Sequence, residues 1–508
     1  MPLQSPCVLA LDIGSTSVRA RLYDADARPV PNIAHEITRR PQPDGVEDAE
    51  QIRGLCEETI TTALEAARAT DPAAGQIGAV AVAMFVGNVL GVDAEGNPVT
   101  PLYTYAHVGA APEVEELRNR LDPELTYDCT GTPFHTSYQA PRILWLQNNE
   151  PGQYSKTARW VDLGTYLYSK WFADLNVPTS YSTASWSGML DRQNLTWYEP
   201  LLDAADINPG ALPPLADYSC AMQGLAPQWA KRWPELANVP FYLAVGDGAG
   251  ANVGSSCTTS GSVALTIGTT GAMRTVMKAG SPTVPRGLWS YRVDAGHELL
   301  GGAITDGGSL LDWLHSTLRL DGEHVQNEDV AAVEPDAHGL TVLPFLRGER
   351  SPGWATEATA TWHGIRASTT APEMARAALE AVTYRLALIS ELLDDGRPQT
   401  AGEPAEEATE IVASGTAILN LPAWLQMVAD VTGKRVVTSP DRGATARGVA
   451  IMALKALGVL ESLHALPAAR KDTYEPDPAR SDLYRRARRR HNDLYDILVQ
   501  SQTNSTSN

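Results

Sequence analysis

The stretch VLALDIGSTSVRARLYD, residues 8–24, is an apolar run that ends on Asp12 and then breaks into glycine and hydroxyl-bearing residues. After the break, apolar Val18, Ala20 and Leu22 alternate with polar or aromatic side chains. This pattern predicts two strands joined by a tight hairpin. A turn of this composition presents backbone N–H groups and hydroxyls to phosphate oxygens without a side-chain clash. We therefore expect the tip of the hairpin to bind an anion.

The bulk composition limits the classes of function. A chain of 508 residues with 43% hydrophobic residues can bury a large core in two or more domains. Its net charge of −20 argues against nucleic acid or an anionic membrane as the main partner. The five cysteines form no CxxC pair, which favours a reducing cytoplasm. The longest uncharged run, 76–92, is short for a membrane span and is interpreted as two strands.

Strand-like and helical segments alternate along the chain, which predicts an α/β architecture with a mixed sheet. A more helical middle follows, and near residue 245 the pattern restarts with VPFYLAVGDGAGANVGSS, residues 239–256. The next segment, GSVALTIGTTGAMRTVM at 261–277, repeats the strand, hydroxyl-rich turn and strand of the opening stretch. Residues 481–500 are predicted to form a helix, with a polar tail after them.

Two facing copies of such a turn could hold one nucleotide between two domains, although each alone could be an ordinary hairpin turn. Other phosphate-binding schemes do not fit the sequence. It contains no G-x-x-x-x-G-K-[ST] motif, which excludes a P-loop. GDGAGA at 246–251 loosely matches a dinucleotide fingerprint, but no acid follows about 20 residues later and no clear helix is expected to begin there. A Rossmann site is therefore excluded.

Several segments, in order, resemble the FGGY carbohydrate kinases of the actin/hexokinase/Hsp70 superfamily, and the gluconokinase-like members in particular. They are DIGSTSVRARLYD, PFHTSYQAPRILWL, SWSGMLDRQNLTWYEPLL, GDGAGANVGSS, LTIGTTGAMRTV, PFLRGERSPGW with MARAALEAVTYRLALI, and ASGTAILNLPAWLQMVADVTGKRV. The resemblance implies two actin-like (ribonuclease H-like) ATPase domains with a cleft between them. The implied domains are 1–245, the sugar-binding side, and 246–498, the ATP-binding side, followed by a disordered tail at 499–508.

The resemblance also implies the site residues, with ATP and Mg²⁺ in the cleft. Asp247 would be the general base that accepts the proton of the attacking hydroxyl, and Asp12 would hold Mg²⁺. The nucleotide would be contacted by Gly14, Ser15, Thr16 and Ser17 from the first turn, by Gly268, Thr269 and Thr270 from the second, and by Gly302, Asp306, Gly308, Gly415, Thr416 and Asn420. Asp306 is expected to be structural rather than catalytic, and Arg19 is either a phosphate contact or an exposed hairpin arginine.

The sequence departs from the family pattern in the expected sugar site. Where similar members have aromatic-x-Asp-x-Arg, this chain has TYAHVGA, with His107 in place of the Asp and Gly109 in place of the Arg. Losing a carboxylate and a guanidinium removes charge-assisted hydrogen bonds to sugar hydroxyls, so specificity is expected to differ. Tyr105, His107 and Asp247 are the substrate candidates, with His135 as a neighbour. Gly443 is a second departure, because an acid often stands there.

The leading hypothesis is an ATP-dependent kinase for a sugar, polyol or sugar acid, either gluconate-like or ketose-like. The alternative is a catalytically impaired homologue that binds sugar or nucleotide as a sensor. An actin-like or chaperone ATPase is the third possibility, and the helical insertion near 105–200 argues against it. We expect a small-molecule substrate, no nucleic-acid or membrane partner and a cytoplasmic location. The oligomeric state stays open, with a homodimer as one candidate.

Overall fold

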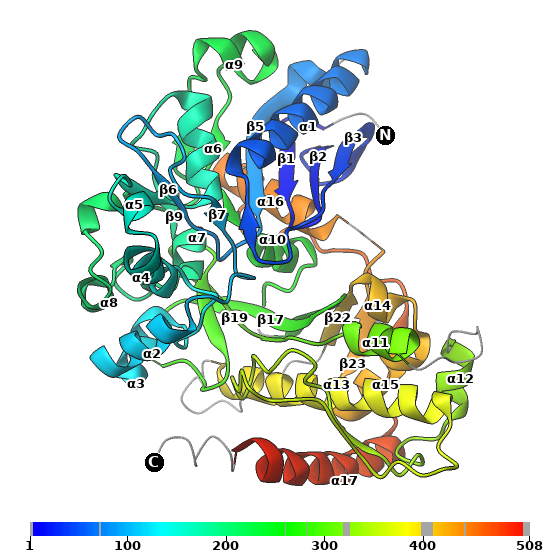
Figure 1. Ribbon diagram of the computed structural model, residues 1–508. Coiled ribbons are helices and arrows are strands. Elements are labelled where there is room, and N and C mark those ends of the chain that lie inside the picture. Colours follow the sequence, from blue (N-terminus) through cyan, green and yellow to red (C-terminus); the bar gives the residue numbers. More distant parts are fainter. Residues whose placement is uncertain are drawn as a thin grey trace.

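The computed structural model describes residues 4–70, 73–259, 261–281, 283–317, 326–397, 410–440 and 443–500. These residues form two lobes, each built around a seven-stranded mixed sheet (Figure 1). Among them, no helix combines the length and apolar character needed to span a membrane. The last part of the expected tail, 501–508, lies outside the described residues, and the preceding Asp496–Gln500 forms a π-helical turn in which Val499 is buried.

The N-terminal sheet begins with the predicted hairpin. β1 (Cys7–Ile13) and β2 (Ser17–Tyr23) pair antiparallel, with Asp12 opposite Arg19. β1 also pairs in parallel with β5 (Ile77–Met84), the predicted buried strand, and β6 (Leu90–Val92) follows it. The other strands of this sheet are β3 (Pro29–Thr38), β13 (Ala221–Met222), β14 (Phe241–Tyr242) and β15 (Val245–Gly246).

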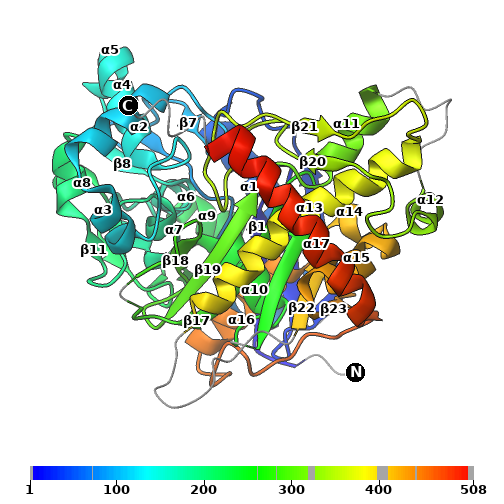
Figure 2. The same cartoon turned by 90° about the horizontal axis from the view of Figure 1, so that it is seen from below.

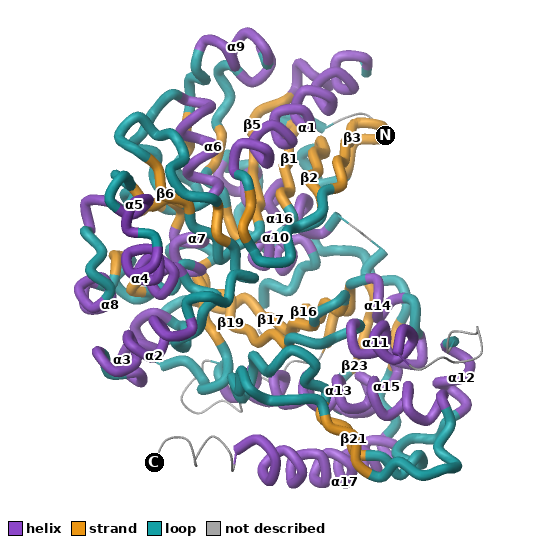
Figure 3. The backbone as a smooth tube through the Cα atoms, viewed as in Figure 1, coloured by secondary structure: helices purple, strands orange, loops and turns teal. Residues whose placement is uncertain are grey.

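The C-terminal sheet repeats this arrangement. β16 (Ser262–Ile267) and β17 (Gly271–Lys278) form the second predicted hairpin, and β16 pairs in parallel with β22 (Glu410–Ser414). The sheet is completed by β18 (Trp289–Arg292), β19 (His297–Ile304), β23 (Arg435–Thr438) and β24 (Thr473–Tyr474). The two hairpins of similar sequence therefore occupy matching places in two similar sheets, as the repeat predicted (Figure 3).

Helix α1 (Ala49–Ala69) begins at Asp48, whose side chain accepts hydrogen bonds from two amides of the first turn, as an N-cap does. Its apolar stripe packs on the N-terminal sheet. The predicted helical middle forms a subdomain beside this sheet, made of α2 (Ala111–Arg120), α3 (Pro123–Thr130), α4 (Gln139–Asn149), α5 (Pro151–Tyr154), α6 (Leu163–Phe172), α7 (Tyr181–Trp186), α8 (Glu199–Ala204) and α9 (Pro227–Arg232).

The C-terminal lobe is covered by the long helix α13 (Ala371–Asp395), which begins with a capping box of Thr370 and Glu373. Figure 2 shows α17 (Pro478–Tyr495), the predicted arginine-rich helix, lying across α13 and α15 (Pro422–Thr432). Three shorter helices complete the lobe: α11 (Ser309–Thr317), α12 (Asn327–Ala332) and α14 (Thr416–Leu419). Several small two-stranded ribbons connect the elements, including β4 (Val46–Glu47) with β7 (Leu102–Tyr103).

Helices α10 (Asp247–Gly254) and α16 (Ala444–Ala456) come after residue 245 in the chain, yet both pack on the N-terminal sheet (Figure 1). They cross very closely, because a Cβ added to Gly448 would lie 1.8 Å from the carbonyl oxygen of Gly250. The expectation that no helix begins at GDGAGA was wrong. Its glycines disfavour a helix intrinsically, but the same glycines allow the close packing that stabilises α10 in the fold.

Candidate active site

The first hairpin turn carries a buried carboxylate. Gly14 N–H donates to the Ser17 carbonyl at 2.8 Å, which closes the turn between β1 and β2. Asp12, the last residue but one of β1, has 7% of its surface exposed, and its Oδ2 accepts from Arg19 Nη1 at 3.3 Å. Burial raises the pKa of Asp12 to about 6 despite the opposing charge of Arg19. Arg19 also pairs with Glu36, so it bridges two carboxylates at the edge of the turn.

The second hairpin turn rests on a neighbouring backbone segment. The N–H groups of Gly307 and Gly308 donate to the carbonyls of Thr269 and Gly268 at 2.9 and 2.8 Å. Asp306, just before these glycines, is buried and accepts from Arg347 and from Ser309 Oγ. Its carboxylate is therefore already occupied by partners that fix the loop.

Gly415 lies beside the second turn. Its φ is +97°, and an added Cβ would lie 2.3 Å from the Ile267 carbonyl oxygen, so only glycine fits at this close approach. Thr416, which begins α14, and Asn420, which follows it, are both exposed. The structure thus brings 268–270, 306–309 and 415–416 together. Gly302 is not part of this group, because it is buried in β19 with an added Cβ 3.0 Å from Ile389 of α13.

Asp247 is the first residue of α10, and it lines one cavity with Thr270 of the second turn. Its Oδ1 accepts from the Gly248 N–H at 2.8 Å. Burial raises the pKa of Asp247, while the charge of Arg274 opposes the rise. The charge of Asp247 in turn contributes to the raised pKa of Asp12. Two carboxylates from different elements therefore share one region of the cleft.

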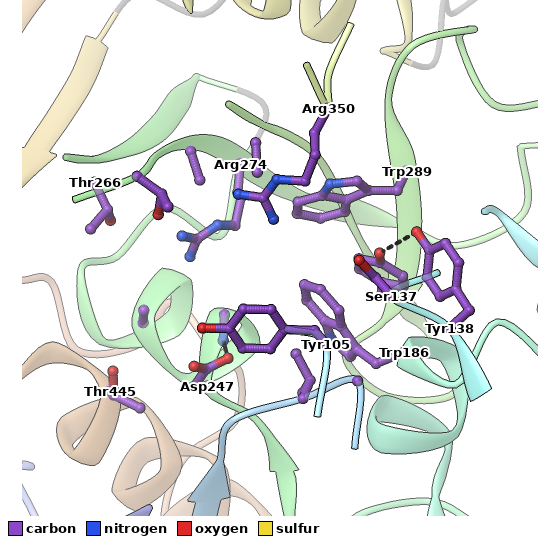
Figure 4. A pocket seen from close by; sticks show the side chains of 18 of the residues that line it. Tyr105, Ser137, Tyr138, Trp186, Asp247, Thr266, Arg274, Trp289, Arg350 and Thr445 are labelled. Carbon is purple, nitrogen blue, oxygen red and sulfur yellow. Dashed lines mark hydrogen bonds between the residues drawn. The ribbon is translucent and has the colours of Figure 1, made fainter. Parts of the chain in front are cut away.

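A cavity of about 340 Å³ opens above Asp247. Figure 4 shows Arg274 and Arg350 pointing into it from the side of the C-terminal sheet, with Asp247 and Tyr105 on the opposite side. Burial lowers the pKa of both guanidinium groups. The remaining walls are largely aromatic and comprise Tyr138, Trp186, Trp289, Tyr291 and Trp354. Trp186 and Tyr291 stack with ring centroids 3.6 Å apart. The cavity thus combines a carboxylate, two cations and flat apolar walls.

The two histidines considered from the sequence lie beside the cavity and do not line it. The His107 ring packs edge-on against Tyr103 and Trp145, with centroids 5.0 and 4.9 Å away. Its Cε1 and Nε2 lie 3.0 Å from where a Cβ of Gly109 would be, so the two departures from the family pattern are neighbours. His135 packs against Trp354 and bonds to Ser137, and burial lowers its pKa to about 4. Of the substrate candidates, Tyr105 and Asp247 line the cavity.

Sequence reasoning missed Arg274, Arg350 and the tryptophans of the cavity. Arg274 stands four residues after the second turn, on β17, and Arg350 lies in the FLRGERSPGW segment. A signal was present for Arg274, because it is a charged residue in the middle of a largely apolar strand. No comparable pattern marks Arg350, whose direction depends on how its loop folds.

Comparisons with known proteins agree with this architecture. Residues 7–254 match the N-terminal domain of the FGGY family of carbohydrate kinases, and residues 263–457 match its C-terminal domain. Together these ranges cover most of the chain, which therefore belongs to the FGGY family of carbohydrate kinases. The chain is accordingly a phosphotransferase, and the predicted family and enzyme class are confirmed.

Individual relatives carry different substrate names. A glycerol kinase of Halorhodospira halophila is 30% identical over 502 residues, covering 95% of each chain. A gluconokinase of Bacillus subtilis is 27% identical over 406 residues, covering 77% of this chain and 76% of the relative. The structure of gluconate kinase from Lactobacillus acidophilus superposes with a TM-score of 0.87 at 24% identity, covering 97% of this chain and 98% of that one. The predicted two-domain, actin-like fold is thereby confirmed.

Proposed function

We propose that this kinase transfers the γ-phosphate of ATP to a hydroxyl group of a small sugar acid, with Asp247 as general base. One observation carries the proposal: Asp247, whose charge acts on Asp12 of the first turn, lines one cavity with Thr270 of the second turn and with Arg274 and Arg350. The gluconokinase and gluconate kinase among its relatives support the same substrate class.

In this proposal Asp247 orients the acceptor hydroxyl and takes its proton as the oxygen attacks phosphorus. Phosphoryl transfer passes through a loose transition state, so positioning and charge neutralisation matter more than strong basicity. Burial raises the pKa of Asp247, and the charge of Arg274 opposes the rise, so the guanidinium favours the ionised carboxylate that can accept a proton. The position at the start of α10 holds the carboxylate rigidly, because its neighbouring N–H already donates to it.

The residues around Asp12 fit a magnesium ion. Mg²⁺ prefers carboxylate and water oxygens, and a cation would stabilise the ionised form of Asp12, whose pKa is raised by burial and by the charge of Asp247. When bound, Mg²⁺ would neutralise charge on the phosphates of the nucleotide. Asp12 would hold it, and Arg19 would keep Asp12 oriented through their 3.3 Å contact.

The nucleotide is proposed to lie along the second turn. An added Cβ at Gly268 would meet nothing within 4 Å, so this part of the turn is open for close approach by a phosphate. Thr269, Thr270 and Thr416 offer hydroxyls on the same group of loops, and Asn420 lies further along. Ser15, Thr16 and Ser17, with Gly14, would face the transferring phosphate from the first turn.

The choice of a sugar acid over a ketose rests on charge. A cavity wall with two guanidinium groups suits a substrate that brings its own carboxylate, and Arg binds carboxylates with paired hydrogen bonds. Arg350 is the proposed partner of the substrate carboxylate. Arg274 is less available, because its charge already interacts with that of Asp247. The aromatic walls and Tyr105 would pack against the carbon chain, with His107 supporting this region from behind Tyr103.

The test is a coupled ADP-release screen of the purified protein with aldonic acids, ketoses, glycerol and other polyols. We expect turnover with an aldonic acid and a loss of about 10²-fold in its kcat/KM in Arg350→Met, with neutral acceptors much less affected. Arg350→Lys serves as the charge-retaining control. Turnover only with neutral acceptors would reject the sugar-acid assignment. Nucleotide binding without turnover on the whole panel would favour a binding protein.

A further inference from the structure

Arg39, just beyond the end of β3, reaches the first hairpin turn from its outer side. Its side chain is only 7% exposed, and its Nη1 donates to the carbonyl oxygens of Ser15 at 2.8 Å and Gly14 at 3.3 Å. Its backbone N–H also donates to the Thr16 carbonyl at 2.8 Å. One residue therefore contacts three successive carbonyls of the turn.

These contacts determine where the turn presents its donors. In a trans peptide, the C=O of one residue and the N–H of the next point in opposite directions. Because the carbonyls of Gly14 and Ser15 point to Arg39, the N–H groups of Ser15 and Thr16 point away from it. Within the described part of the chain, neither N–H group donates a hydrogen bond to another protein atom. Successive oriented amides of this kind form an anion-binding site.

The guanidinium itself is anchored on a buried frame. Arg39 Nη2 pairs with Glu47 Oε2 at 2.7 Å, and the Glu47 side chain is 6% exposed. Glu47 belongs to β4, which pairs with β7, two residues before Tyr105 of the cavity. Arg39 also lies over the Phe85 ring, 5.6 Å from its centroid, next to the cavity residue Val86. The turn is thus connected through Arg39 to two segments that line the substrate cavity.

From these contacts we infer that Arg39 is a positioning residue for phosphoryl transfer, which aims the Ser15 and Thr16 amides at the transferring phosphate. This rests on the proposed function, because it requires ATP in the cleft. Arg39 acts from behind the turn and touches neither nucleotide nor acceptor. Lysine cannot replace it fully, since a single ammonium lacks the fork that serves Glu47 and two carbonyls together.

The test compares two nucleotides that differ at the transferring phosphate. Binding of Mg·ADP and Mg·AMP-PNP is measured by calorimetry for the wild type and for Arg39→Met. We expect the Kd of AMP-PNP to rise about 10-fold and kcat to fall about 10²-fold, with the Kd of ADP changed less than about 2-fold. If Arg39 had a purely structural role, its replacement would weaken the binding of both nucleotides alike. Arg39→Lys should give an intermediate loss confined to AMP-PNP.

Arg53→Met is the matched control, because Arg53 pairs with Glu57 at 2.5 Å in the same lobe and does not contact the turn. Equal losses for ADP and AMP-PNP, or unchanged AMP-PNP binding, would overturn the inference. If Arg39→Met does not fold, the inference is tested by the ratio of the Kd of AMP-PNP to the Kd of ADP in Arg39→Lys, which should be higher than in the wild type. Failure of the proposed function is recognised separately, since the wild type itself would then show no phosphoryl transfer.

Discussion

The two hairpin turns have similar sequences, IGST and IGTT, but they are supported in opposite ways. The first turn is held mainly by a side chain, because its Gly14 and Ser15 carbonyls accept from the Arg39 guanidinium and only its Thr16 carbonyl accepts from the Arg39 backbone N–H. The second is held by the main chain, because its carbonyls accept from Gly307 and Gly308. Similar turns can therefore depend on different kinds of residue. The first is vulnerable to loss of a long cationic side chain, and the second to gain of a Cβ.

The two lobes also differ in the charged groups that they contribute to the site. The N-terminal lobe contributes the carboxylates Asp12 and Asp247, through β1 and through α10 packed on its sheet. The C-terminal lobe contributes the guanidinium groups Arg274 and Arg350. The cavity is thus lined by carboxylate on the side of one lobe and by guanidinium groups on the side of the other.

The largest effect on kcat is expected from replacing Asp247. Asp247→Asn keeps the shape of the side chain but cannot accept a proton, so kcat should fall by about 10³-fold. Because neither turn is altered, Mg·ADP should bind with nearly the wild-type Kd in calorimetry. A variant that retains most of its turnover would show that Asp247 is not the base.

Asp12→Asn tests the carboxylate of the side-chain-held turn. Activity should fall by about 10²-fold, because the proposed magnesium ligand is lost. The stability of the folded protein should increase. Burial raises the folded pKa of Asp12 from an ordinary 3.8 to about 6, so ionised Asp12 opposes folding above that pH.

Without Mg²⁺, Asp12→Asn should therefore increase the free energy of unfolding by about 3 kcal/mol at pH 8. The gain should shrink as the pH falls through 6 and vanish near 4, where wild-type Asp12 is protonated in the folded protein. Urea unfolding at pH 8 and pH 4 measures this gain, with Asp26→Asn, in the partly exposed turn before β3, as the control. A gain that does not depend on pH would contradict the role of ionisation.

Gly307→Ala tests the main-chain-held turn. Its Cβ would lie 2.7 Å from the Thr270 carbonyl carbon and oxygen, so the turn must shift. We expect ADP and AMP-PNP to lose affinity equally, by about 10-fold, in contrast to the Arg39 variants. Gly54→Ala in α1, where an added Cβ meets nothing within 4 Å, is the control and should bind both nucleotides normally. If Gly307→Ala weakened the binding of AMP-PNP but not of ADP, the two turns would not differ in the way proposed.

Local sequence pattern was enough to predict both hairpins, the buried β5, the helical middle and α17, because each depends on hydrophobic periodicity along one segment. The pattern could not reveal α10, whose glycine-rich sequence becomes helical only against α16. It also could not place Arg350 in the cavity or the His107 ring against Trp145. Those positions depend on contacts between segments that are far apart in the chain.

Helix α16 has a consequence for how the protein is made. It completes the core of the N-terminal lobe, where Val449 and Met452 join Val8 and Ala81 in one cluster. On a ribosome, the first sheet would wait with one face uncovered until more than 440 residues had been synthesised. The first lobe to be translated therefore completes its core only after most of the second lobe has been made.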